Sequence, residues 1–316
     1  MNLIDRIFNE PELRDRPPIL VDVGAAGGVH AAWRRITRYS IGVGFEPDAR
    51  ESAPLAAAHR KFLHWIFCPG LAAPSLSAEK SLPFHLTAAP QCSSVLPPQP
   101  LEDWLFADQF AVVETRRFPA VTLVDALAAQ KLDRIDWLKC DTQGLDLKLY
   151  LSLPEAWRAR MLMAEFEPGF IDAYAGEDHV ADVLLAMRAE PFWLAEFHVM
   201  RTPRARRDLL AKDFSPRGLK WLRRLASPAP GWANLSFQRD VTRQPETLDR
   251  RAWLLAWVFA AISRQHGQAV TVARGGEGRF GGELFARMTA ASLTHLREDM
   301  LRNFPGLVWK RLFRGA

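Results

Sequence analysis

The segment "PPILVDVGAAGGVH" (17–30) is an apolar run that ends in an aspartate and passes directly into glycines. A short apolar run of this kind is typical of a buried strand, and glycines allow a tight turn or a close approach of the backbone to a ligand. The next apolar run, "SIGVGFEP" (40–47), ends in Glu46. A strand, a glycine turn and a second strand ending in a carboxylate together indicate an α/β sheet that binds a nucleotide.

Strand-like and helix-like segments continue to alternate along the chain, which predicts an α/β fold with a mostly parallel sheet. The seven expected strands are residues 17–23, 40–47, 61–68, 134–141, 160–167, 192–199 and 233–240. The helices expected between them are residues 29–38, a segment reaching Arg60, and residues 121–130, 143–151 and 177–190. Because no strong helical pattern joins the last two strands, we expect the last strand to be antiparallel.

Three further regions surround or interrupt this pattern. Residues 1–17 are expected to form an amphipathic N-terminal helix that precedes the sheet domain of residues 18–240. Residues 241–316 are expected to form a helical C-terminal extension with a glycine-rich break at 275–282. Residues 69–120 are proline-rich, which predicts an insertion that carries a β-hairpin at one end of the sheet.

The composition is that of an ordinary globular protein, with 48% hydrophobic and 24% charged residues among 316. The N-terminus has charges every few residues and lacks the apolar centre of a signal peptide. The longest apolar run, residues 252–262, is shorter than the roughly 20 residues that cross a membrane. The three cysteines, Cys68, Cys92 and Cys140, form no CxxC pair. These features predict a cytoplasmic, reduced protein.

The net charge of +5 is unevenly distributed. Residues 201–224 contain nine Lys or Arg against two Asp, and residues 241–316 contain twelve Lys or Arg against six Asp or Glu. The basic insert at 201–224 would suit an anionic partner, such as a phosphorylated or uronic-acid sugar or a lipid head group. A solvated helical surface is the alternative. Since no RNA-binding module accompanies this insert, no nucleic-acid partner is expected.

The glycine turn differs from a dinucleotide site, because the six residues from Gly24 are GAAGGV and not GxGxxG. Asp22 would repel a pyrophosphate but would suit a cationic ligand without phosphate, such as S-adenosylmethionine. Glu46 can accept hydrogen bonds from the hydroxyls of a ribose. The residues expected to bind this cofactor are Asp22, Gly24, Ala25, Gly27, Gly28, Glu46 and Asp141. An NAD-linked oxidoreductase is a weaker alternative, and a turn that serves only for tight packing is another.

The fourth strand ends at Asp141, in "WLKCDTQGLD" (137–146), beside the crevice where open α/β sheets bind ligands. Asp141 could accept a proton from a substrate, or it could only cap the next helix. The fifth strand ends in "AEFEPG", with Glu165 and Glu167 in one phase of the strand, and His198 ends the sixth strand. The candidate general bases are therefore Asp141, Glu165, Glu167 and His198.

Carboxylates gathered at one crevice can also hold a divalent cation. Asp141 and Glu167 are the candidate metal ligands. The alternative is that the glutamates pair with Arg158 or Arg160 at the surface. His30 could contact the cofactor or the acceptor, although a lone histidine is more often structural.

Several segments resemble the FkbM-type family of class I S-adenosylmethionine-dependent methyltransferases and lie in that family's order. These segments are "ILVDVGAAGG", "GFEPDA", "PQCSSVLPP", "VVETRRFPAVTLVDAL", "IDWLKCDTQGLDLKLY", "AEFEP" and "WANLSFQRD". The resemblance implies a Rossmann-like class I methyltransferase fold, and O-methyl transfer to a hydroxyl of a sugar, glycan or related metabolite. The family often has Glu at the positions of Gln143 and Asp146, and Gln143 is neither a base nor a strong metal ligand.

The serines of "QCSSV" lie in the insertion, which is expected to fold over the methyl acceptor. Ser93, Ser94 and Gln143 are the candidate acceptor contacts, and a plain loop turn is the alternative for the two serines. The rival function is a non-catalytic binding protein on the same fold, which grips an anionic glycan or lipid through residues 201–224. The tail "FPGLVWKRLFRGA" (304–316) could lie on an anionic membrane surface or pack against protein.

Overall fold

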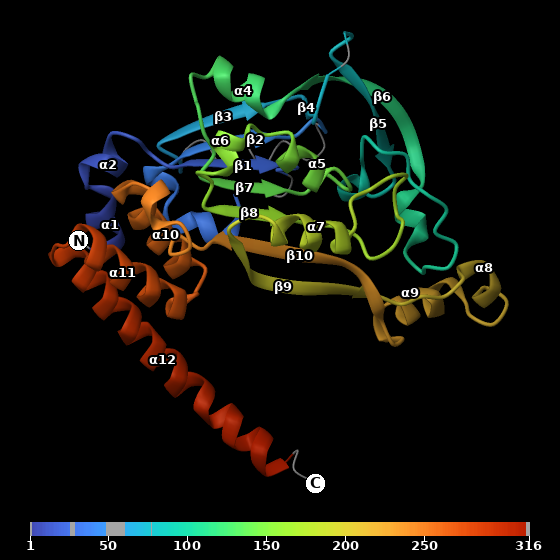
Figure 1. The fold of residues 1–316 in the computed structure, drawn as a ribbon. Coiled ribbons are helices and arrows are strands. Elements are labelled where there is room, and N and C mark those ends of the chain that lie inside the picture. Colours follow the sequence, from blue (N-terminus) through green and yellow to red (C-terminus); the bar gives the residue numbers. More distant parts are fainter. Residues whose placement is uncertain (1, 26–28, 49–60, 77, 314–316) are drawn as a thin grey trace. The chain divides into compact units, whose positions relative to one another are not determined.

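The computed structural model describes residues 2–25, 29–48, 61–76 and 78–313, with side chains as far as residue 304. The chain forms two compact units (Figure 1). One unit is Pro18–Gln238, and the other combines Met1–Pro17 with Arg239–Ala316.

The first unit is built on a seven-stranded sheet with the strand order β3-β2-β1-β7-β8-β10-β9 (Figure 1). The strands are β1 (Ile19–Val23), β2 (Ile41–Phe45), β3 (His64–Cys68), β7 (Trp137–Cys140), β8 (Met163–Phe166), β9 (Phe192–Thr202) and β10 (Ala229–Arg239). The first five in spatial order are parallel, whereas β10 is antiparallel to β8. This confirms the predicted α/β fold with a mostly parallel sheet and an antiparallel last strand. The arrangement is compatible with a Rossmann-like fold.

One face of this sheet carries the main hydrophobic core. Side chains alternate between the two faces of a strand, so Val21, Leu138 and Ala164 all lie on the core face and are buried. The helices that cover this face are α4 (Leu123–Ala129), α5 (Asp146–Leu151) and α7 (Val180–Arg188), and the short α6 (Glu155–Arg158) lies between the last two in sequence. These elements match the helices predicted at 121–130, 143–151 and 177–190.

The helix predicted at 29–38 is not an α-helix. Its place is taken by two 3₁₀ helices, η1 (Ala31–Arg35) and η2 (Thr37–Tyr39). A 3₁₀ helix has three residues per turn, which places residues 30, 33 and 36 along one side. Trp33 and Ile36 are buried, and the His30 ring contacts Trp33 with 5.4 Å between ring centroids. The packing of this row explains the tighter winding. The helix expected to reach Arg60 lies outside the described residues.

The insertion forms a small second sheet with the order β4-β6-β5. Its strands are β4 (Leu71–Ala72), β5 (Ser81–Thr87) and β6 (Val112–Val121), and β5 pairs antiparallel with β6 as predicted. The connection between these two strands contains the 3₁₀ helices η4 (Pro90–Cys92) and η5 (Ala107–Phe110). A separate cluster of buried side chains stabilises this sheet: Leu71, Ala73, Phe84, Leu86 and Ala120.

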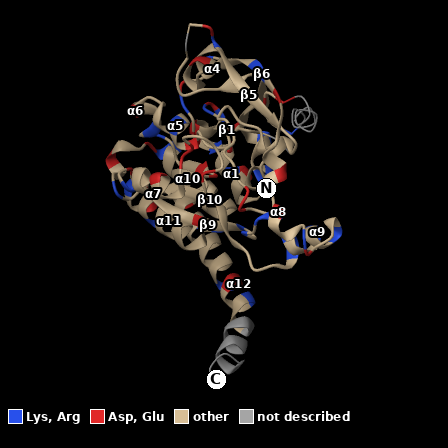
Figure 2. Ribbon diagram, turned by 90° about the vertical axis from the view of Figure 1, so that its right-hand side faces the viewer, with Lys and Arg blue, Asp and Glu red and all other residues tan. Residues whose placement is uncertain are grey.

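The basic insert between β9 and β10 contains two helices, α8 (Arg207–Leu210) and α9 (Pro216–Leu225). In Figure 2 the ribbon of both helices carries blue segments, which mark Lys and Arg positions. Ser215 caps α9, since its hydroxyl accepts the N–H of Gly218 at 3.2 Å.

The second unit is helical. Its helices are α1 (Leu3–Phe8), α2 (Pro11–Arg14), η6 (Pro245–Thr247), α10 (Arg250–Ile262), α11 (His266–Phe280) and α12 (Glu283–Phe313). The N-terminal segment is divided into two helices and not one, because Pro11 begins a new helix at a position where its missing N–H is tolerated. Arg250 joins the two ends of the chain through ion pairs with Glu10 and Glu12, at 2.8 and 2.6 Å.

The predicted glycine-rich break at 275–282 is narrower in the structure. Helix α11 continues through Gly275 and Gly276, and only Gly281 and Gly282, both with positive φ, separate it from α12. A Cβ at Gly275 or Gly276 would clash with the ring of Trp253 or Phe285, respectively. These two glycines therefore allow close packing of aromatic rings instead of ending the helix. Across the described residues, the search for a helix with the length and apolarity needed to cross a membrane finds none.

Candidate functional site

The carboxyl ends of β1 and β7 meet closely at Gly24 and Asp141. The Asp141 N–H donates to the Val23 carbonyl at 2.9 Å, and Gly24 has a φ of 78°. A Cβ at position 24 would clash with the Asp141 carbonyl oxygen. Gly24 is therefore required by the packing of the two strand ends, which is a different reason from the predicted approach of a ligand.

The loop after β7 is organised by Asp146, which is buried. Its carboxylate accepts the N–H and the hydroxyl of Thr142, at 2.8 and 2.6 Å, and the N–H of Glu167 at 2.7 Å. Burial raises the pKa of Asp146, and the hydrogen bonds from Thr142 oppose this shift. Asp146 thus joins the end of β7 to the end of β8 and positions both Asp141 and Glu167.

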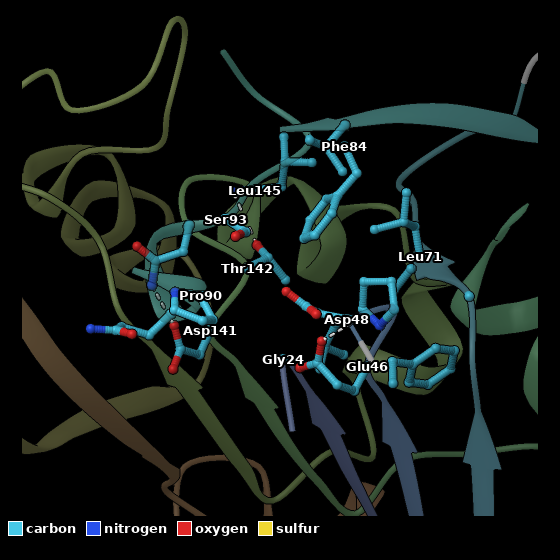
Figure 3. Close-up of a pocket in the computed structure, with 18 residues that line it drawn as sticks. Gly24, Glu46, Asp48, Leu71, Phe84, Pro90, Ser93, Asp141, Thr142 and Leu145 are labelled. Atoms are coloured by element: carbon cyan, nitrogen blue, oxygen red, sulfur yellow. Dashed lines mark hydrogen bonds between the residues drawn. The ribbon is translucent and has the colours of Figure 1, made fainter. Parts of the chain in front are cut away.

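A first cavity, here called the Glu46 cavity, lies at the ends of β1, β2 and β7. Its walls include Gly24, Glu46, Asp48, Leu71, Phe84, Ser93, Asp141, Thr142, Gln143 and Leu145. Figure 3 shows Glu46, Asp48, Leu71 and Phe84 grouped on one side of this space and Asp141 on the other. Its volume of about 80 Å³ is below the roughly 300–1,000 Å³ typical of ligand sites, so a ligand of nucleoside size must widen it.

Two buried carboxylates follow β2 in this cavity, Glu46 and Asp48. Glu46 Oε1 accepts the N–H of Asp48 at 2.8 Å. Glu46 was predicted to be a ligand contact, whereas Asp48 was not. Asp48 lies two residues after Glu46 in "FEPD", and this spacing could have indicated from the sequence that both carboxylates face the same cavity.

A second cavity, here called the Tyr174 cavity, adjoins the first and has a volume of about 360 Å³. Three residues line both cavities: Gln91, Asp141 and Gln143. The other walls include Phe106, Phe110, Glu167, Tyr174, Glu177, Arg201, Arg223 and Trp232. This cavity therefore combines acidic, aromatic and basic side chains, and it meets the Glu46 cavity at Asp141.

Asp141 and Glu167 form a pair of neighbouring carboxyl groups on the wall of the Tyr174 cavity. Burial raises the pKa of Glu167 to about 8, and the negative charges of Asp141 and Asp146 contribute to this shift. With a pKa of about 8, the Glu167 carboxyl keeps its proton at neutral pH beside Asp141. The pair can therefore hold or accept a proton inside the cavity.

Gln143 contacts this pair and has a positive φ of 57°. Its side-chain amide donates to Asp141 Oδ1 at 2.8 Å. The Tyr174 hydroxyl lies 3.1 Å from Gln143 Oε1 and donates to the Cys92 carbonyl at 2.8 Å. Gln143 therefore fixes the direction of the Asp141 carboxylate toward the junction of the two cavities.

The two predicted serine contacts have different positions. Ser93 lines the Glu46 cavity and accepts the N–H of Thr87 at 3.1 Å. Ser94 is fully buried, and its hydroxyl donates to the Gln143 carbonyl at 2.8 Å and accepts the N–H of Leu96 at 3.0 Å. Ser94 therefore fastens the insertion to the loop after β7.

Asp22 faces away from both cavities and is one of a polar row across the sheet. Asp22, Lys139 and Glu165 lie in register on β1, β7 and β8. Lys139 Nζ is 2.9 Å from Asp22 Oδ1. Although burial would lower the pKa of Lys139, the charges of Asp22, Asp141 and Glu165 raise it above its ordinary value. Because Lys139 neutralises Asp22, the predicted contact between Asp22 and a cationic cofactor is not supported by this geometry.

Glu165 and His198 line a third space, here called the His198 cavity, together with His30, Glu167 and Glu196. Glu165 accepts the Trp137 indole N–H at 2.7 Å and lies 3.4 Å from His30 Nε2. Burial raises the pKa of Glu165 to about 7 and lowers that of His30 to about 4. Glu165 and Glu167 thus share one cavity, as their phase predicted, but only Glu167 reaches Asp141.

The remaining predicted residues are Ala25, Gly27, Gly28 and the metal ligands. Ala25 is fully buried, and its N–H donates to the Phe45 carbonyl at 3.1 Å. Gly27 and Gly28 lie outside the described residues. No group of three His, Cys, Asp or Glu side chains suited to a metal occurs in the part of the chain that the structure describes.

The residues missed by sequence reasoning come from segments far apart in the chain. Phe106 and Phe110 lie in the insertion, Tyr174 follows β8, and Trp232 lies on β10. Their rings form a continuous wall, with centroid separations of 6.4 Å for Phe106 and Trp232, 5.3 Å for Phe106 and Phe110, and 5.5 Å for Phe110 and Tyr174. No local pattern in the sequence marks these residues as neighbours.

Comparisons of this chain with protein-family models, with curated proteins and with solved structures found no match.

Proposed function

We propose that this protein is an S-adenosylmethionine-dependent O-methyltransferase that acts on a hydroxyl of a sugar, glycan or related metabolite. The observation that carries the proposal is the junction of two cavities at Asp141 and Gln143. One cavity has the carboxylates expected around a ribose, and the other has a carboxyl pair that can accept a proton. A group transfer between two bound molecules requires such a junction, because most of the acceleration comes from holding the reacting atoms in line.

The Glu46 cavity supports the cofactor assignment through its polar and apolar walls. The carboxylates of Glu46 and Asp48 can accept the two hydroxyls of a ribose. Leu71 and Phe84 offer apolar surface for a flat base. S-adenosylmethionine would supply an electrophilic methyl group on a sulfonium at this position. The five-residue 3₁₀ helix η1 offers no α-helix N-terminus for a pyrophosphate, which makes NAD a poorer fit.

The Asp141–Glu167 pair supports the assignment of the proton step. An alcohol is a weak nucleophile until its proton is accepted by a positioned base. In the proposed reaction, the acceptor oxygen forms a bond to the methyl carbon, the bond from that carbon to sulfur breaks, and the hydroxyl proton passes to the carboxyl pair. Gln143 would keep the Asp141 carboxylate oriented during this step.

The resemblance to the FkbM-type family supports this proposal, because residues of one of the resembling segments lie at the junction of the two cavities. In "CDTQGLD", Asp141 and Gln143 are at the junction, and Asp146 positions Glu167. Membership of that family and the class I methyltransferase fold are part of the proposal.

The test is calorimetric titration of the full chain with S-adenosylmethionine, S-adenosylhomocysteine and NAD. We expect both adenosyl ligands to bind with micromolar affinity and NAD to bind at least tenfold more weakly. Glu46→Gln should lower the affinity for S-adenosylhomocysteine about tenfold, since it removes charge-assisted hydrogen bonds but keeps an acceptor for the Asp48 N–H. The absence of binding by either adenosyl ligand would refute the proposal and favour a non-catalytic binding protein.

A further inference from the structure

Five of the seven arginines of the basic insert fall into two groups. Arg204, Arg206 and Arg207 each form an ion pair with a nearby aspartate, at 3.1, 2.7 and 2.6 Å. Arg201 and Arg223 instead line the Tyr174 cavity, and neither forms an ion pair with any residue that the structure describes. What sets Arg201 and Arg223 apart is that both line one cavity and neither has an ion-pair partner among the described residues.

Arg201 and Arg223 come from different elements that converge on this cavity. Arg201 lies near the end of β9, and the half-buried Arg223 lies in the last turn of α9. Burial raises the pKa of Cys92, on the cavity wall, to about 11, and the positive charge of Arg223 opposes that shift. The charge of Arg223 therefore acts inside the cavity as well as at the surface.

The carboxylates of the cavity do not neutralise these arginines. Glu177 is tied to the wall, since its Oε1 accepts the N–H groups of Ala173 and Tyr174. Asp141 also lines the Glu46 cavity, and Glu167 lies beside Asp141. Arg223 adjoins a different space, a cavity of about 260 Å³ under α9. Among the described residues, no carboxylate of the Tyr174 cavity forms an ion pair with Arg201 or Arg223.

The aromatic wall formed by Phe106, Phe110, Tyr174 and Trp232 lines the same cavity. Flat rings offer apolar contact to the face of a small ring compound. Guanidinium groups bind carboxylates and phosphates through paired hydrogen bonds. The cavity therefore has surfaces for a ring, for a hydroxyl next to a proton acceptor, and for an anionic substituent.

We propose that the Tyr174 cavity binds a small, hydroxyl-bearing ring compound with an anionic substituent, a carboxylate or a phosphate monoester, which Arg201 and Arg223 hold. That this compound is the methyl acceptor rests on the proposed function, whereas its binding does not. The arginines would hold the anionic end and direct a hydroxyl toward Asp141.

The test measures binding of three matched sugars by ligand-observed NMR or calorimetry: neutral glucose, glucuronate and glucose 6-phosphate. We expect at least one anionic sugar to bind about tenfold or more tightly than glucose, because hydrogen bonds between charged groups are the stronger ones. The double variant Arg201→Gln, Arg223→Gln should reduce that preference to less than about threefold. Arg206→Gln is the matched control, since Arg206 pairs with Asp208 at the surface, and it should keep the preference. Whether glucuronate or glucose 6-phosphate binds better distinguishes a carboxylate from a phosphate.

Equal binding of neutral and anionic sugars would overturn the inference, as would a preference that survives in the double variant. The absence of binding by all three sugars would also overturn it. Each titration is made alone and with saturating S-adenosylhomocysteine. Anionic sugars that bind to a chain without affinity for S-adenosylhomocysteine would support the inference and refute the methyltransferase. Binding of S-adenosylhomocysteine by a chain that does not prefer anionic sugars over glucose would support the methyltransferase and refute the inference.

Discussion

Two acidic clusters lie within a few residues of each other on the same sheet and differ in what surrounds them. Asp22 and Glu165 lie inside strands β1 and β8, in register with Lys139 between them. Asp141 and Glu167 lie just beyond the ends of β7 and β8. The first cluster contains its own cation, whereas Asp141 and Glu167 form no ion pair within the described part of the chain.

The comparison shows how position relative to a strand end decides the role of a carboxylate. A side chain inside a strand has neighbours fixed by the register, so a basic residue opposite it neutralises its charge. A side chain beyond the strand end is presented to the crevice at the carboxyl edge of the sheet, where ligands bind. We therefore propose that the in-strand cluster serves stability and the strand-end cluster serves function.

The largest effect is expected for Asp141→Asn. Loss of a positioned general base should lower the turnover of methyl transfer about 10²–10⁴-fold, while Asn keeps an oxygen that accepts from Gln143. The measurement is single-turnover methyl transfer to an accepted sugar, with the affinity for S-adenosylhomocysteine measured in parallel. We expect that affinity to change less than about threefold. Unchanged turnover would show that Asp141 only terminates the strand.

Lys139→Met should mainly destabilise the sheet unit. The substitution leaves the buried Asp22 carboxylate without its cation, and breaking a buried ion pair in this way costs about 3–5 kcal/mol. The free energy of unfolding in urea measures this loss. The double variant Asp22→Asn, Lys139→Met is the control and should recover most of it, because both charges are then absent. Equal stability of the single variant and the parent would show that the row is not neutralised by Lys139.

Much of the fold follows from local sequence patterns. Apolar runs predicted all seven strands, and the last strand is antiparallel as expected, although helices α8 and α9 lie in the connection before it. Two helical details were wrong, the α-helix at 29–38 and the wide break at 275–282. In both cases tertiary packing overrides local preference. At 29–38 the His30 and Trp33 rings pack against each other at the start of the first 3₁₀ helix. At 275–282 the glycines of α11 leave room for aromatic rings, so the helix continues.

The candidate site was less predictable than the fold, for a physical reason. Strand-end residues such as Glu46 and Asp141 are recognisable because parallel strands bring their carboxyl ends to one edge. The partner of Asp22 depends on the register of β1 with β7, which apolar runs do not specify. The wall of the Tyr174 cavity unites four distant segments, and only the folded chain shows that Arg223 reaches it.

Glu167→Gln should alter how stability depends on pH. The folded pKa of Glu167 is about 8 against an ordinary 4.5, so the folded state binds more protons than the unfolded state between these values. Stability of the parent therefore falls as pH rises from about 4.5 to 8. Gln cannot titrate, so the variant should gain on the order of 4 kcal/mol relative to the parent between pH 5 and 8.5.

The measurement is urea unfolding of both proteins at pH 5 and pH 8.5. Glu114→Gln is the control, since Glu114 is exposed and pairs with Arg116 at the surface, and its difference from the parent should not change with pH. Parallel pH profiles for Glu167→Gln and the parent would show that the pKa of Glu167 is not raised in the folded protein.

Glu165→Gln is expected to have the smallest effect, although Glu165 was a candidate base from the sequence. Gln can still accept the Trp137 N–H, and its amide can donate to His30, whose pKa of about 4 keeps the imidazole neutral. Lys139 retains Asp22 as its partner. Turnover should therefore stay within about threefold of the parent, as for substitutions that do not touch the reacting atoms.

A loss of a hundredfold or more would connect Glu165 and His30 to the proton pathway through Glu167, which lines both the Tyr174 and the His198 cavities. The two clusters would then act as one relay, and the division between a structural and a functional cluster would be wrong.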